Sequence, residues 1–128
     1  MERYSASVAQ SNKGLLKTIE YNPVRKRGLA YETRIKITDD TIVDCSIVGD
    51  KLLMKVEVEY VPRRKLLEFE SFRKYLESLR NGILEEYCLT ILNDLTEVLD
   101  PIEISVTVEG VTHGHGTAVV KMRAVGRR

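Results

Sequence analysis

Residues 68–81 read EFESFRKYLESLRN, and this stretch decides how the chain folds. Its apolar side chains recur every three or four residues, which places them on one side of an α-helix, while charged side chains occupy the other. The Asn81-Gly82 pair that follows is typical of a helix end and a turn. The stretch therefore predicts a short amphipathic helix. Its apolar positions are Phe72, Tyr75, Leu76 and Leu79, and its charged positions are Arg73, Lys74, Glu77 and Arg80.

Regular patterns on both sides of this helix predict the rest of the fold. A second apolar stripe at helical spacing covers residues 84–99 and ends before Asp100-Pro101. Asp39-Asp40 and Pro62 are expected to end the first and second of four strands. The order is strand, strand, helix, helix, strand, strand, an α+β arrangement written ββααββ. The strands are predicted from alternating apolar and polar residues at 31–38, 54–60, 102–109 and 118–125.

Two helices can cover only one face of a four-stranded sheet. The polar residues of the predicted strands gather on the other face, where Glu, Lys and Arg predominate. A face so charged is either exposed to solvent or in contact with a partner. The edge strands of an open sheet are exposed templates for pairing, which gives assembly into a ring a physical motive.

The length and charge of the chain limit what it can be. With 128 residues we expect one domain at 29–128, preceded by an N-terminal arm at 1–28 with one short strand near 15–19. The 20 basic and 19 acidic residues nearly cancel, so the net charge of the chain does not indicate binding to nucleic acid or to a membrane. Local basic clusters at 25–27 and 63–65 are either a surface for an anionic ligand or solvated loops. The N-terminus lacks a signal-peptide pattern, so a cytoplasmic location is expected.

The wording of residues 68–81 resembles the signature segment of the QueF family, nitrile reductases that act on 7-cyano-7-deazaguanine. In that family the segment reads Glu-Ser-Lys-Ser-apolar-Lys-apolar-Tyr, followed by Ser-Phe-Arg-Asn. Arg73 stands for the second lysine, whereas Phe69 replaces a serine and Glu70 replaces the first lysine. The resemblance implies the tunnelling fold (T-fold), a four-stranded antiparallel sheet with two helices on one face that assembles into a barrel. The matching positions are Glu68, Ser71, Phe72, Tyr75, Ser78, Arg80 and Asn81.

Cys45 lies between the first two predicted strands, and from its spacing it is either a small buried hydrophobe or a reactive thiol. The family's nucleophile opens a Cys-Pro-apolar-Thr-Gly segment at this place, so the resemblance assigns that role to Cys45. Addition of a thiolate to a nitrile carbon gives a thioimide that a second reactant can attack. Without gaps the family's general acid falls on Leu52. A slide of two residues keeps every side chain on its face and puts Asp50 there, so we assign Asp50, with a plain loop aspartate as the other interpretation.

The resemblance also implies a carboxylate that binds the substrate at the start of the second helix. In the family a His-Glu pair at this place binds the edge of the deazaguanine base. Glu85 matches the glutamate, and Leu84 takes the place of the histidine. A helix N-terminus favours a carboxylate in any protein, so Glu85 also has a structural interpretation. Glu68 and Ser71 of the signature are assigned to substrate binding as well.

Three functions remain open. In the first, ammonia attacks the thioimide and forms the amidine of archaeosine in tRNA, as in the archaeal QueF-like archaeosine synthases, and no cofactor is needed. In the second, NADPH reduces the free base toward queuosine, with Arg73 and Lys74 holding the cofactor. In the third, a non-catalytic T-fold ring binds a ligand. We favour the first, because Glu70 stands where a lysine of the family meets the phosphates of NADPH.

The favoured function makes the partners a 7-deazaguanine base in tRNA, ammonia and further copies of the chain. A metal is not expected. His113 and His115 flank a glycine and predict a hairpin, because no third group of ligands is placed to join them. Cys88 lies inside the second apolar stripe, where packing explains it.

Overall fold

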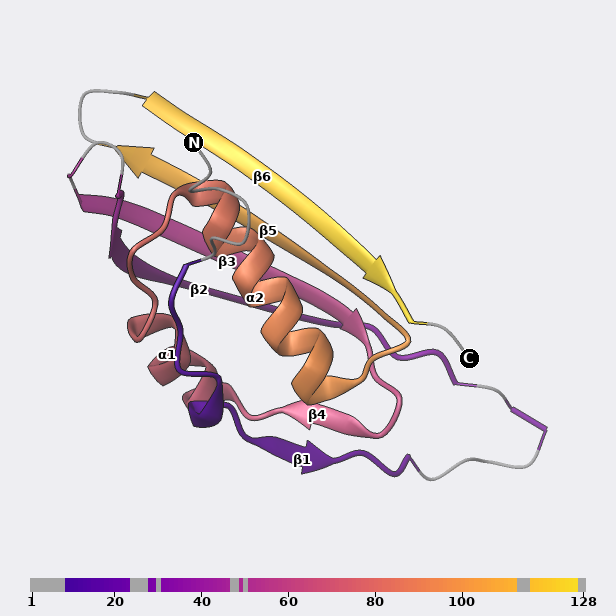
Figure 1. Ribbon diagram of the computed structural model, residues 1–128. Helices are drawn as coiled ribbons and strands as arrows, with labels where there is room; N and C mark the ends of the chain where they lie inside the picture. The colour runs from indigo at the N-terminus through magenta and orange to yellow at the C-terminus, as the bar shows by residue number, and fades with distance from the viewer. Residues whose placement is uncertain are drawn as a thin grey trace.

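The structure, a computed structural model, describes residues 9–23, 28–29, 31–46, 49, 51–112 and 116–126. The main sheet has four antiparallel strands in the order β2-β3-β5-β6. Both helices lie on the same face of it (Figure 1). The elements are a 3-10 turn η2 (Lys13–Leu15), strands β1 (Thr18–Glu20), β2 (Ile35–Asp44), β3 (Lys51–Val61) and β4 (Lys65–Leu67), helices α1 (Phe69–Glu77) and α2 (Leu84–Leu99), and strands β5 (Glu103–Thr112) and β6 (Gly116–Val125).

The core lies between the sheet and the two helices. Burying an apolar side chain of this size contributes about 1.5–3 kcal/mol, so one alternating strand supplies much of the stability. β3 is the central example, because every second residue faces the helices and is at most 5% exposed. These residues are Leu52, Met54, Val56, Val58 and Tyr60. The helices complete the core with Phe72, Tyr75, Leu76, Tyr87, Ile91, Leu95 and Leu99.

The predicted ββααββ order is confirmed, with two differences. β2 does not end at Asp39-Asp40 but continues to Asp44, and it begins at Ile35. A carboxylate is tolerated inside it because Asp39 turns toward α1 and accepts from Arg73 at 3.3 Å. The second difference is β4, which pairs antiparallel with β1 in a separate two-stranded sheet. A three-residue strand is too short for its alternation to be recognised in the sequence.

Residues 9–17, here called the strap, lie against α1 and the segment that follows it. Gln10 and Arg80 exchange two backbone hydrogen bonds of 2.8 and 3.0 Å. The Asn12 N–H donates to the Ser78 hydroxyl at 2.9 Å, and the Lys17 N–H donates to the Ser71 hydroxyl at 3.0 Å. The strap is therefore fastened largely by residues of the 68–81 signature.

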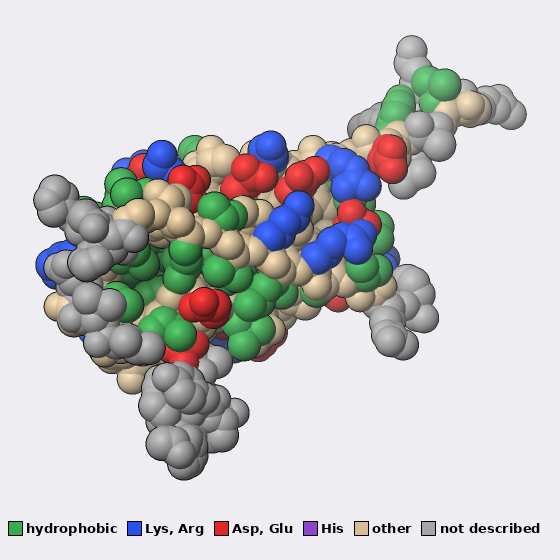
Figure 2. Space-filling view, turned by 90° about the horizontal axis from the view of Figure 1, so that it is seen from above, with side chains coloured by type: hydrophobic (Ala, Val, Ile, Leu, Met, Phe, Trp, Pro, Cys, Tyr) green, Lys and Arg blue, Asp and Glu red, His purple; other side chains and the backbone are tan. Residues whose placement is uncertain are grey.

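The other face of the sheet carries charged residues, as predicted. Cross-strand ion pairs include Arg34 with Glu103 at 2.9 Å and Lys36 with Glu57 at 3.7 Å. Basic and acidic side chains stand interspersed along one side of the molecule in the view from above (Figure 2). Assembly of such sheets into a barrel stays a prediction. Within the described residues no helix is long and apolar enough to cross a membrane.

Candidate functional site

Cys45 directly follows β2 and is held beside the segment that joins the two helices. It forms a parallel bridge with Gly82, and the Ser46 N–H donates to the Gly82 carbonyl at 3.0 Å. On its other side the Gly49 N–H donates to the Cys45 carbonyl at 2.7 Å. The thiol is half-buried. The structure thus places Cys45 on a hydrogen-bonded loop end with part of its side chain open.

The hydroxyl of Tyr87, on the first turn of α2, joins the two segments at this point. It donates to the Asp44 carbonyl at 2.6 Å and accepts from the Gly82 N–H at 3.1 Å. Burial, followed by the nearby charges of Asp44, Cys45 and Glu86, raises the pKa of Tyr87, although the Gly82 N–H opposes this. The hydroxyl therefore keeps its proton and remains a donor at physiological pH.

The charges around Cys45 are partly balanced. A carboxylate disfavours a thiolate beside it, and Asp44 is the neighbouring residue in the chain. The Asp44 carboxylate lies 3.2 Å from the Lys51 ammonium on the adjacent strand. Because both side chains are exposed, this ion pair contributes little to the free energy of folding. It does place the Lys51 ammonium next to the loop that contains Cys45.

Cys88 is also a free thiol, but its setting differs from that of Cys45. Its side chain is fully buried against β5, where it donates to the Val106 carbonyl at 3.4 Å. Burial raises the pKa of Cys88 to about 11, so it stays protonated. The prediction that Cys88 serves packing is confirmed.

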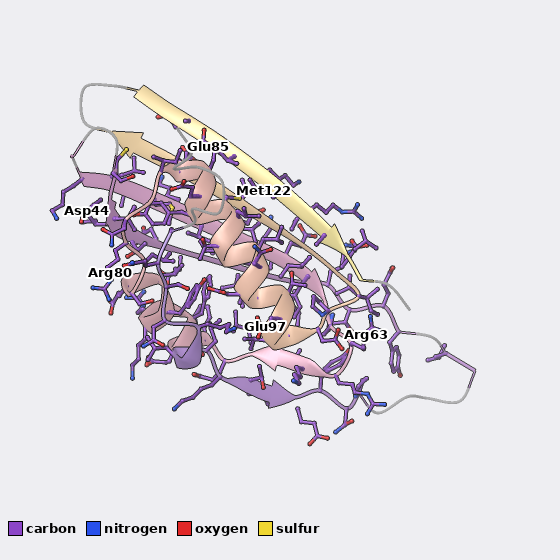
Figure 3. All side chains as sticks on the ribbon, in the orientation of Figure 1. Asp44, Arg63, Arg80, Glu85, Glu97 and Met122 are labelled. Atoms are coloured by element: carbon purple, nitrogen blue, oxygen red, sulfur yellow. The ribbon has the colours of Figure 1, made fainter. Side chains whose placement is uncertain are left out.

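The two glutamates that open α2 point in different directions. Glu85 is exposed, whereas Glu86 is buried and accepts from the Ile83 N–H at 3.2 Å. Figure 3 places Glu85 and Asp44 toward the same end of the molecule, with Arg63 toward the opposite end. Glu86 lies on the side of Gly82, since one of its carboxylate oxygens is 3.4 Å from where a Cβ on Gly82 would be. The sequence places Glu86 beside Glu85 at the helix start, where the helix dipole favours both carboxylates, and it gives no local signal that Glu86 is the buried one.

Glu68 and Ser71 lie at the far end of α1 from this site. The Glu68 carboxylate accepts from the N–H groups of Ser71 and Glu70 at 2.9 and 3.1 Å, which caps the helix. Those bonds, the Ser71 N–H first, lower the pKa of Glu68. The nine residues of α1 span about 13 Å, and Gly82 follows the opposite end. The structure therefore does not bring Glu68 and Ser71 together with Cys45.

The residues predicted to meet NADPH are placed on the exposed side of α1. Arg73 pairs with Asp39 at 3.3 Å, and the Asp39 side chain is only 12% exposed. Lys74 and Glu70 are both exposed on the same helix. One of the two predicted cations thus already has a carboxylate partner.

Several predicted residues fall outside the part of the chain that the structure describes. These are the general acid Asp50, the histidines His113 and His115, and the basic cluster 25–27. Among the described residues, no group of three or more His, Cys, Asp or Glu is arranged to hold a metal ion.

Comparison with known proteins identifies the family. The model of the QueF-like protein family matches residues 53–125, more than half of the chain. The chain belongs to the QueF-like family. It is 37% identical over 92 residues to the NADPH-dependent 7-cyano-7-deazaguanine reductase of Caldanaerobacter subterraneus subsp. tengcongensis, covering 70% of this chain and 66% of that protein. The corresponding reductase of Thermoanaerobacter pseudethanolicus is 36% identical over the same length, with the same coverage.

The chain spans just under two thirds of the length of these two QueF-like relatives. A solved structure is also similar, the crystal structure of the archaeosine synthase QueF-Like in the apo form. It superimposes with a TM-score of 0.66 at 25% identity, over 74% of this chain and 96% of that one. The resemblance found in residues 68–81 is therefore confirmed, as is the T-fold arrangement of sheet and helices. By name, the two bacterial relatives are NADPH-dependent reductases, whereas the solved structure is an archaeosine synthase.

Proposed function

We propose that this QueF-like chain acts on the nitrile of 7-cyano-7-deazaguanine through Cys45 and completes the reaction with ammonia, forming an amidine on the base in tRNA. The Cys45 sulfur adds to the nitrile carbon, and the nitrile nitrogen takes a proton, which gives a thioimide. Ammonia then adds to the same carbon and the C–S bond breaks. The products are an amidine and the free thiol, so no oxidant or reductant is consumed.

Support for the first step comes from the setting of Cys45. The thiol is half-buried, and the peptides around it are fixed by hydrogen bonds to Gly82 and Tyr87. A fixed nucleophile meets the nitrile carbon at a smaller entropic cost than a mobile one. Asp50 is our proposed proton donor, since it follows Gly49 in the same loop of the sequence.

Glu85 is our proposed ligand for the edge of the base. Its exposed carboxylate at the end of the molecule near Asp44 can accept two N–H donors from a deazaguanine. Glu86 is the other carboxylate of the first turn, and its bond to the Ile83 N–H gives it a structural task as well. Glu68 and Ser71 contribute, on this proposal, only by holding the signature helix and the strap.

The choice of ammonia over hydride is carried by the pairing of Arg73 with Asp39. Phosphates of a dinucleotide need cationic groups, and here one cation is already matched at 3.3 Å while the Glu70 carboxylate stands exposed nearby. Of the two predicted cations, Lys74 then remains as a single exposed charge for the phosphates, with the Glu70 carboxylate on the same helix opposing it. The residues present therefore do not fit NADPH at this position.

A tRNA substrate is supported by cations at the other end of the sheet. Arg64 and Lys65 are exposed at the start of β4, where they can meet phosphate oxygens. Such contacts release counterions, so the affinity for tRNA should fall steeply as salt rises. Arg63 is less available, because its guanidinium is half-buried and donates to the Asp100 carbonyl at 3.2 Å.

The alternative is an NADPH-dependent reductase, and the names of the two bacterial relatives favour it. Two parallel assays separate the functions. We expect conversion of nitrile-bearing tRNA to the amidine that depends on ammonium and is lost in Cys45→Ala. With free 7-cyano-7-deazaguanine and NADPH we expect no oxidation above the background of Cys45→Ala. NADPH consumption that needs both the nitrile and Cys45 would replace our proposal by the reductase.

A further inference from the structure

The peptide groups on both sides of Cys45 are held by one small network. Before the cysteine, the Tyr87 hydroxyl donates to the Asp44 carbonyl at 2.6 Å. After it, the Ser46 N–H donates to the Gly82 carbonyl at 3.0 Å. The same hydroxyl accepts from the Gly82 N–H at 3.1 Å, so it joins the two halves. Hydrogen bonds that are chained in this way polarise and strengthen one another.

Fixing both flanking peptides fixes the direction of the Cys45 Cα–Cβ bond. The sulfur is then left with rotation about a single torsion, which has three staggered positions. Among the described residues, Tyr87 provides the side-chain part of this arrangement, because the bonds made by Gly82 and Gly49 come from backbone. Removing its hydroxyl would leave the buried Gly82 N–H and the part-buried Asp44 carbonyl without this partner while keeping the ring in the core.

We propose that Tyr87 is the positioning residue that aims the Cys45 thiol at the nitrile carbon. This inference rests on the proposed function, in which Cys45 is the nucleophile. Tyr87 acts through the loop and not on the substrate. Its ring packing, with an exposed fraction of 0%, would be served equally by phenylalanine, so the hydroxyl is the part to which the role is assigned.

The test compares Tyr87→Phe with Tyr75→Phe. Tyr75 is a matched control, because it is equally buried and its hydroxyl donates to a partner at 2.6 Å, in this case the Asp94 carboxylate. Two rates are measured for each variant. One is alkylation of Cys45 by iodoacetamide, followed on the peptide that contains it, and the other is formation of the covalent adduct with saturating 7-cyano-7-deazaguanine.

In Tyr87→Phe we expect alkylation to become several-fold faster, because a loosened loop exposes the half-buried thiol. Adduct formation should become about tenfold slower, because the sulfur is no longer aimed. Tyr75→Phe should match the parent in both. Alkylation of Tyr87→Phe at or below the parent rate, or an equal change in Tyr75→Phe, would overturn the positioning role. If the parent forms no adduct, the proposed function fails, while the alkylation rates still decide whether Tyr87 holds the loop.

A measurement on the parent protein protects the test against a variant that does not fold. The Ser46 and Gly82 amides donate within the network and should exchange their hydrogens much more slowly than exposed amides. Exchange of both at the rate of an exposed amide would also overturn the proposal.

Discussion

The two ends of α1 use their polar groups in opposite ways. At the N-terminal end, Glu68 caps the helix and the Ser71 hydroxyl accepts from the strap residue Lys17, so both are occupied by the protein itself. Past the C-terminal end, Gly82 holds the loop of Cys45, whose thiol is half-open. The polar groups at the N-terminal end are thus used up within the fold, whereas the loop past the C-terminal end keeps a half-exposed thiol, which is where we propose that the chemistry takes place.

A substitution at the C-terminal end should have the largest effect. A Cβ on Gly82 would lie 2.7 Å from the Cβ of Ala9 and 3.1 Å from its Cα. We therefore expect Gly82→Ala to lower the free energy of unfolding by about 1–3 kcal/mol, as overpacking does. Gly14→Ala is the control, since its nearest neighbour is a side-chain oxygen at 3.4 Å. Urea unfolding of both variants measures the difference, and equal midpoints would show that the strap does not press on Gly82.

A charge at the N-terminal end should have a smaller effect that depends on pH. The folded-state pKa of Glu68 is lowered from its usual 4.5, chiefly by the Ser71 N–H. A lowered pKa means that the carboxylate stabilises the fold above its unfolded-state pKa, and that this stabilisation is lost as the pH falls through the folded-state value. Glu68→Gln should therefore be less stable than the parent at pH 7, with the gap closing below about pH 4.

Thermal unfolding across this pH range measures the gap. Glu77→Gln removes a carboxylate from the other end of α1, where the helix dipole disfavours one. That variant should not lose stability at pH 7. A constant gap between Glu68→Gln and the parent at all pH values would mean that the charge of Glu68 plays no part in the cap.

Much of the fold could be predicted because burial imposes simple periods. β3 alternates so regularly that both its face and its end before Pro62 follow from the sequence. The predicted end of β2 came too early because two aspartates suggest a turn, whereas the strand continues through its pairing with β3 and the Asp39 carboxylate is matched by Arg73 on another element. Such a contact between residues 34 positions apart leaves no local pattern.

The candidate site could be predicted only in part. Cys45 was found through a motif, and the structure adds the bridge to Gly82. Tyr87 was missed because its ring fits the apolar stripe of α2, and the task of its hydroxyl depends on two loops meeting there. The role of Asp50 stays a prediction, since it lies outside the described residues.

The central claim is that Cys45 forms a covalent bond with the nitrile, and the intact mass of the protein tests it most directly. After incubation with 7-cyano-7-deazaguanine, in the absence of ammonium and NADPH, we predict a mass increase equal to one molecule of the base. Cys88→Ala, which removes the buried thiol, should retain the adduct, and Cys45→Ala should lose it. An unmodified parent protein, or an adduct that persists in Cys45→Ala, would contradict the account.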